Sequence, residues 1–135
     1  MNMPVRTLLL GLVFLSGCGA VRELDGEVTL DGVPIEQGSI LFVPTAKNRG
    51  KVASGSIEKG KFRLTGEQAP TPGAYLVEIR ASRKTGKKVR KPYGKPGEME
   101  DELVEAVAPR YNRATKLTTE IKGGKESVKF AVHSR

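Results

Sequence analysis

Residues 73–81 read Gly-Ala-Tyr-Leu-Val-Glu-Ile-Arg-Ala and carry the clearest alternation of side chains in the chain. Tyr, Val, Ile and Ala at the odd positions from 75 to 81 fall on one face, and Leu, Glu and Arg at the even positions fall on the other. A period of two is that of a β-strand with one buried face. This segment therefore predicts a long strand.

Shorter runs of the same kind lie on both sides of this strand, separated by turn residues. They are residues 26–30, 39–43, 51–57, 61–65, 115–122 and a last strand through 128–132. Asp31-Gly32 and Glu58-Lys59-Gly60 predict tight hairpin turns. The pattern as a whole predicts an all-β protein, an antiparallel seven-stranded β-sandwich.

One segment has the spacing of a helix. In residues 98–107, Leu103, Val104 and Val107 form a small apolar stripe that Pro109 would end. We predict a short helix there.

The composition restricts the class of protein further. The 135 residues include 16 Gly and 8 Pro, a density that excludes a bundle of long helices, and the formal net charge is +8. One Cys excludes an internal disulfide, and one Cys with one His leaves no ordinary zinc site. We expect one small domain with no metal and no cofactor.

The first twenty residues predict export. Arg6 precedes a short apolar run, Leu8 to Leu15, which is too short to cross a bilayer as a helix. Leu15-Ser16-Gly17-Cys18 resembles the lipobox of bacterial lipoproteins. The resemblance implies a cleaved signal peptide over 1–17, diacylglycerol on the Cys18 thiol and acylation of the new amino terminus.

Two alternatives to lipidation remain, namely ordinary secretory cleavage after Ala20 and an uncut N-terminus. With lipidation, residues 18–24 form a tether and residues 25–135 form the domain. Several acyl chains would hold such a domain on the periplasmic side of a membrane. Neither Gly19 nor Ala20 is the Asp that retains some lipoproteins in the inner membrane, which favours the outer membrane.

Several turn and core motifs carry a family resemblance. They are residues 26–35, residues 38–44, Pro72-Gly73-Ala74-Tyr75 and Pro109-Arg110-Tyr111-Asn112. With them the chain resembles small bacterial lipoproteins that have a transthyretin-like or carboxypeptidase-regulatory-like domain. The resemblance implies the fold and does not specify an activity.

Candidates for catalysis are few. The only imidazole is His133, near the end of the chain, and the acidic residues of 98–105 lack the spacing of a calcium loop. We expect Tyr111 to bury its ring and hydrogen-bond its hydroxyl to backbone, and Asn112 to cap a turn. We therefore expect no enzyme. The alternative, an enzyme of unknown type, would need a pocket at Tyr111, Asn112, His133 or the acidic cluster.

A basic segment is the one unusual surface feature. Residues 80–95 hold eight cations and no acid, and the candidate anionic-partner patch within them is Arg83, Lys84, Lys87, Lys88, Arg90 and Lys91. An envelope protein or an anionic envelope polymer would fit this charge, and nucleic acid is not expected outside the cytoplasm. The simpler interpretation is a long mobile loop kept soluble by its charge. The sequence thus predicts a non-catalytic binding or structural module, or alternatively an adhesion or assembly module that binds polymer through this segment.

Overall fold

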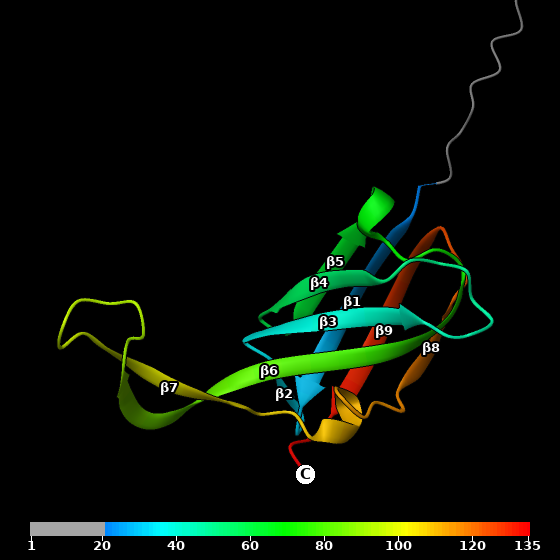
Figure 1. Cartoon of the computed structure of the whole chain (residues 1–135). Coiled ribbons are helices and arrows are strands. Elements are labelled where there is room, and N and C mark those ends of the chain that lie inside the picture. Colours follow the sequence, from blue (N-terminus) through cyan, green and yellow to red (C-terminus); the bar gives the residue numbers. More distant parts are fainter. Residues whose placement is uncertain (1–20) are drawn as a thin grey trace, which may run out of the picture.

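Nine β-strands and two short 3-10 helices build residues 21–135, the part of the chain that this computed structural model describes (Figure 1). The elements are β1 (Glu23–Leu30), β2 (Val33–Pro34), β3 (Gln37–Pro44), β4 (Ala53–Glu58), β5 (Lys61–Thr65), η1 (Gly66–Gln68), β6 (Gly73–Arg90), β7 (Met99–Glu105), η2 (Pro109–Tyr111), β8 (Thr118–Ile121) and β9 (Lys125–Val132). The all-β prediction is confirmed. The strands number nine instead of seven, because the two-residue β2 and the whole of β7 were not predicted as strands.

The strands lie in two layers that meet at one hairpin. In the first layer β1 pairs with β5 and β9, and in the second β3 pairs with β4 and β6, while β8 pairs with β6. β4 and β5 share a single register pair, Glu58 with Lys61, and then diverge into the two layers. This arrangement is compatible with a β-sandwich. Among the described strands only β1 and β9 run parallel, and the other pairings are antiparallel.

The core lies between the layers. Apolar side chains at alternate positions of each strand enter it, as expected for strands with one buried face. Its fully buried members include Leu24, Val28, Leu64 and Val132 from the first layer and Ile40, Phe42, Ile57, Tyr75, Val77 and Ile79 from the second. The Phe42 ring lies between the layers, with its centroid 6.0 Å from that of Phe62 and 6.5 Å from that of Phe130. The odd positions from 75 to 81 are all buried, as the alternation predicts.

Two tight turns follow the predicted positions. Asp31 and Gly32 have φ angles of 50° and 83°, and Lys59 and Gly60 have φ angles of 50° and 76°. Consecutive positive φ angles define the turn whose twist matches a two-residue hairpin, and Gly and Asp adopt them most easily. The predicted turns at 31–32 and 58–60 are confirmed.

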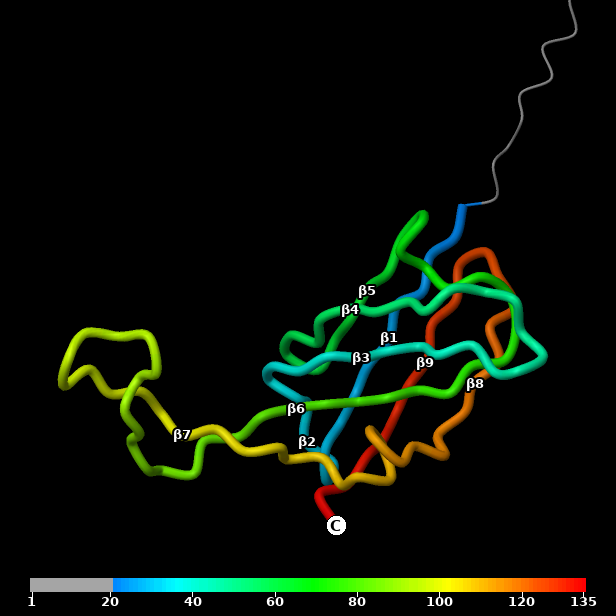
Figure 2. Tube along the Cα trace, in the orientation of Figure 1, coloured from blue at the N-terminus to red at the C-terminus, as the bar shows by residue number. Residues whose placement is uncertain are grey.

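β6 runs far beyond the sandwich. Its first half pairs with β3 and β8, and its second half pairs with β7 from Ser82 to Arg90. Together they form a two-stranded ribbon over residues 82–105, called the arm below, which projects from one side of the body (Figures 1 and 2). The arm leaves the half of the body that is remote from residue 21.

The arm corrects two predictions. The helix predicted over 98–107 is wrong, because Met99–Glu105 is the strand β7. A helix would have stacked the like charges of Glu98, Asp101, Glu102 and Glu105 at spacings of three and four, which is unfavourable. The mobile-loop interpretation of 80–95 is also wrong for most of its length, because residues through Arg90 belong to β6.

Candidate binding site on the arm

The arm has no core of its own. No residue from Ser82 to Glu105 is buried, whereas Ala81 and Ala106 at its root are. An isolated two-stranded hairpin is marginally stable in water, so cross-strand side-chain contacts must hold this one in shape.

An irregularity sets which side chains meet. Lys84 lies opposite Leu103 and Lys88 lies opposite Asp101, so three residues of β6 face one residue of β7 between these pairs. This bulge returns Lys84 and Lys88 to the same face of the ribbon. Both ammonium groups then contact one carboxylate, because Asp101 lies 2.7 Å from Lys84 Nζ and 2.6 Å from Lys88 Nζ.

The ion pairs shift the titration of their members. The hydrogen bond from Lys84, followed by that from Lys88, lowers the pKa of Asp101 to about 2. The same contact raises the pKa of Lys84, chiefly through its hydrogen bond to Asp101. Asp101 therefore carries its charge at any neutral or mildly acidic pH.

Glu98 closes the tip of the arm. Its Oε1 atom lies 2.9 Å from Lys91 Nζ, its Oε2 atom accepts a hydrogen bond from the Lys95 backbone N–H, and its carbonyl accepts one from the Lys91 N–H. These contacts, with that from Lys91 the largest, lower the pKa of Glu98. Tyr93 lies on this turn with its side chain fully exposed.

Other carboxylates hold the root and the bulge. Glu105 Oε1 accepts hydrogen bonds from the backbone N–H groups of Ala81 and Val107, both at 3.1 Å. In the bulge, Thr85 Oγ1 donates to Glu102 Oε2 at 2.6 Å. Four of the five carboxylates of the acidic cluster are thus used in hydrogen bonds and ion pairs of the arm, and Glu100 is the exception among the described contacts. No group of three or more metal-ligating side chains occurs within residues 21–135.

The structure divides the predicted basic patch into two halves. Lys84, Lys88 and Lys91 are ion-paired, whereas Arg83, Lys87 and Arg90 have no carboxylate within 4 Å among the described residues. The arm's seven cations and five carboxylates leave a formal charge of +2. The sequence places the acids after the basic segment, and the hairpin folds them back against it.

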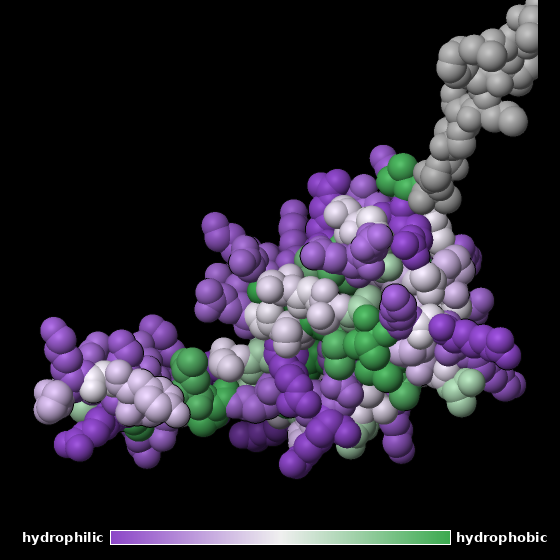
Figure 3. All heavy atoms as spheres, turned by 45° about the horizontal axis from the view of Figure 1, so that its top comes forward, coloured by the Kyte–Doolittle hydropathy of each residue, from purple (hydrophilic) through white to green (hydrophobic). Residues whose placement is uncertain are grey.

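Apolar side chains on the arm were not predicted as part of the site. Leu103 is 58% exposed, Met99 is 52% exposed, and both lie on the face that bears Lys84 and Lys88. Figure 3 shows a hydrophobic patch on the arm between its hydrophilic end and the body. Residues 99–105 have no alternation of apolar and polar side chains, since Leu103 and Val104 are adjacent, so the sequence contains no clear signal for this strand.

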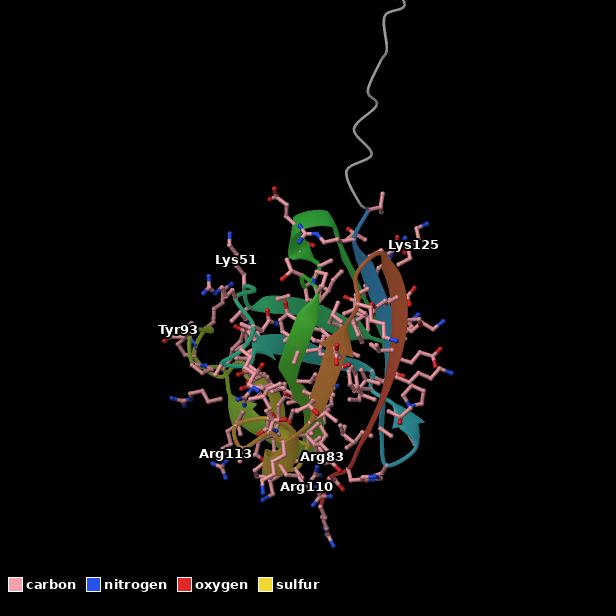
Figure 4. All side chains as sticks on the ribbon, turned by 90° about the vertical axis from the view of Figure 1, so that its right-hand side faces the viewer. Lys51, Arg83, Tyr93, Arg110, Arg113 and Lys125 are labelled. Atoms are coloured by element: carbon pink, nitrogen blue, oxygen red, sulfur yellow. The ribbon has the colours of Figure 1, made fainter. Side chains whose placement is uncertain are left out.

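The residues considered for catalysis have structural contacts. Asn112 is buried, its Nδ2 atom donates to the Val107 carbonyl at 3.2 Å, and its Oδ1 atom accepts from the Arg113 N–H at 2.7 Å, so the predicted turn cap is confirmed. Tyr111 is only partly buried, with the Arg110 guanidinium 4.9 Å from its ring centroid. His133 Nδ1 lies 3.3 Å from Asp31 at an exposed position. Arg110 lies at the lower end of the body in Figure 4, far from the exit of residue 21.

Cys18 lies outside the described residues, so its lipidation stays a prediction. Within residues 21–135, no helix has the length and apolar character needed to cross a bilayer. The chain matches no protein-family model, no curated protein and no solved structure in the three comparisons made.

Proposed function

We propose that the protein is an exported lipoprotein with a transthyretin-like domain that acts as a non-catalytic binding module of the cell envelope. Cys18 would hold it on the periplasmic side of a membrane, with the outer membrane favoured. The arm would meet the partner. The observation that carries the proposal is the arm itself, a projecting ribbon without buried residues that presents unpaired cations and exposed apolar side chains.

A lipid on Cys18 would hold the body on a short tether. The first strand begins at Glu23, five residues after this cysteine, and Leu24 is already in the core. Five residues span at most roughly 17 Å, so a lipid at Cys18 would keep the body close to the membrane surface. The arm leaves the remote half of the body (Figure 1) and would then be accessible to a partner in the envelope.

The surface chemistry of the arm favours a protein partner over an anionic polymer. A polymer-binding surface needs a dense field of one sign, but three of the six patch cations already have carboxylate partners. The remaining combination of Arg83, Arg90, Tyr93 and Leu103 resembles the composition of protein interfaces, which are enriched in Arg and aromatic residues. The polymer-binding alternative therefore stands second.

Capture in cells tests the binding role. The full-length protein and a variant with Arg83, Lys87 and Arg90 replaced by Gln would be crosslinked in cells and their partners identified by mass spectrometry. A control with Arg113, Lys116 and Lys129 replaced by Gln has the same charge change on the body. We expect one reproducible partner that is lost only in the arm variant. Equal capture by all three proteins would contradict binding through the arm.

The anchor has its own test. The intact mass of the purified protein should correspond to a chain that begins at Cys18 and carries acyl chains. A Cys18→Ala variant should lack this mass and should leave the membrane fraction. A chain that begins after Ala20, or one that keeps residues 1–17, would contradict the lipoprotein assignment.

A further inference from the structure

The end of the sandwich nearest the tether is rich in cations. This surface, called the tether end, comprises residues 21–22, the β3–β4 loop over 45–52, residues 66–72 and residues 122–125. Its charged residues are Arg22, Lys47, Arg49, Lys51, Lys122 and Lys125, with Glu67 as the only carboxylate.

The fold brings these four segments together. Lys125 lies beside Glu23 in the parallel pairing of β9 with β1, and the Gly66 N–H donates to the Arg22 carbonyl at 2.9 Å. Arg22, Arg49 and Lys51 line one groove of ≈ 620 Å³. In Figure 4, Lys51 and Lys125 lie on either side of the point where the chain leaves the body at residue 21.

The carboxylates nearest to the tether end do not form ion pairs with its cations. Glu23 is ion-paired with Arg63 at 2.8 Å, and Glu126 accepts a hydrogen bond from the backbone N–H of Lys122. Glu120 lies exposed on β8. Within residues 21–135, none of the six cations of the tether end has a carboxylate oxygen within 4 Å.

We infer that the tether end rests on anionic lipid head groups and so holds the domain upright on the membrane. The inference rests on the proposed attachment through Cys18. Charges act over about 8 Å at physiological ionic strength, and only the tether end is kept near the surface by the short tether. The opposite end also carries cations. Arg113 lies with Arg110 at the lower end of the body in Figure 4, away from residue 21, and the Lys116 N–H donates to the Arg110 carbonyl. Arg135 follows Ser134, which bonds to Asp31 beyond the far end of β1, and the Lys59 N–H donates to the Glu36 carbonyl.

The orientation has a consequence for the arm. An upright domain keeps the arm clear of the lipid, because the arm projects sideways from the half of the body that is remote from residue 21 (Figure 1). A domain without this contact would be free to tilt about its tether, and the arm would then approach the membrane. The tether end thus serves as a second, electrostatic anchor that sets the accessibility of the arm.

Energy transfer from the tip of the arm measures this orientation. Tyr93→Cys provides a labelling site, since Tyr93 is fully exposed and the chain's one native Cys would be lipidated. The full-length labelled protein is reconstituted on vesicles of phosphatidylcholine with phosphatidylglycerol that contain a lipid-bound acceptor. One variant replaces Arg49, Lys51, Lys122 and Lys125 by Gln. The matched control replaces Lys59, Arg113, Lys116 and Arg135 by Gln.

We expect weak transfer from the parent protein and from the control, and stronger transfer from the tether-end variant. Near an anionic surface each Lys or Arg contributes about 1 kcal/mol, so the ratio of upright to tilted molecules should fall about fivefold for each charge removed. Equal transfer in all three proteins, or an equal rise in both variants, would overturn the inference.

The intact mass of the same samples shows whether Cys18 carries the lipid anchor, independently of the energy transfer. If Cys18 is unmodified, the proposal that the protein is a lipoprotein is wrong. Flotation of the protein with the same vesicles then tests directly whether the tether end binds anionic lipid. Flotation that is weakened only in the tether-end variant would support the inference. Flotation weakened equally in both variants, or in neither, would overturn it.

Discussion

Lys88 lies directly opposite Asp101 in the arm, with its ammonium nitrogen 2.6 Å from the carboxylate. The bulge before Lys88 gives the same carboxylate a second lysine, Lys84. No residue of the arm is buried, so ion pairs and hydrogen bonds between its two strands hold its shape. Asp101 is therefore central to the stability of the candidate binding site.

Replacing Asp101 by Asn should loosen the arm without unfolding the body. Two ammonium groups would lose their shared partner, and exposed two-stranded ribbons have little else to stabilise them. We expect faster amide hydrogen exchange in residues 82–105 and an unchanged melting temperature of the sandwich. Glu100→Gln removes the same charge from a residue with no ion pair among the described residues and should leave exchange unchanged. Equal acceleration in both variants would contradict this role of Asp101.

The arm should keep its ion pairs down to strongly acidic pH. The pKa of Asp101 is lowered from 3.8 to about 2 in the folded chain, so its contribution to stability is fully present above 3.8 and is lost as the pH falls through about 2. Carboxyl chemical shifts in NMR report this midpoint. In a variant with Lys84 and Lys88 replaced by Gln, the midpoint should return toward 3.8. A midpoint near 3.8 in the parent protein would show that the pairs do not form in solution.

The Tyr75 hydroxyl should contribute to stability, whereas that of Tyr111 should not. Tyr75 is fully buried and its hydroxyl donates to the Thr71 carbonyl at 2.8 Å. Removing a buried hydrogen bond of this kind costs about 1 kcal/mol, so Tyr75→Phe should lower the free energy of unfolding by that amount in urea denaturation. Tyr111→Phe is the control, because no hydrogen bond of its hydroxyl occurs within residues 21–135. A larger loss for Tyr111→Phe would reverse this assignment.

Asp31 should fix the end of the chain to the first hairpin. Its carboxylate accepts hydrogen bonds from the Ser134 hydroxyl at 2.7 Å and the Ser134 N–H at 3.2 Å, and these contacts, with His133, lower its pKa. Asp31→Asn should raise the backbone mobility of residues 133–135 in heteronuclear NOE measurements. The turn itself should persist, because Asn adopts the positive φ of this position as readily as Asp. Rigid residues 133–135 in the variant would show that other contacts hold them.

The parts of the fold that were predictable are those with local signals. The alternation at 75–81 and the turns at 31–32 and 58–60 depend on residues that are adjacent in the sequence. The parallel pairing of β1 with β9 and the divergence of β4 from β5 depend on contacts between distant segments, which one sequence does not reveal. The predicted position of a hydrogen-bonded tyrosine was wrong for the same reason, since only the fold distinguishes the buried Tyr75 from Tyr111.

The candidate site was predictable only in part. The basic segment is evident from composition, but its structure depends on pairing with residues 99–105, whose apolar residues have the spacing of a helical stripe. The carboxylates of this segment decide which cations stay unpaired, and the bulge at residues 85–87 decides which of them share a face. Neither property follows from a count of charges. The predicted lipidation site at Cys18, in contrast, depends only on a local motif, and it lies outside the described residues.

Photocrosslinking from the arm in living cells tests the central claim most directly. A photoreactive amino acid would replace Leu103 on the arm in one protein and Val33 on the body in another, two apolar residues of similar exposure, 58% and 65%. We predict a discrete adduct from position 103 that disappears when Arg83, Lys87 and Arg90 are replaced by Gln, and no such adduct from position 33. An adduct from position 33 alone, or the same adduct from both positions, would contradict a binding role for the arm.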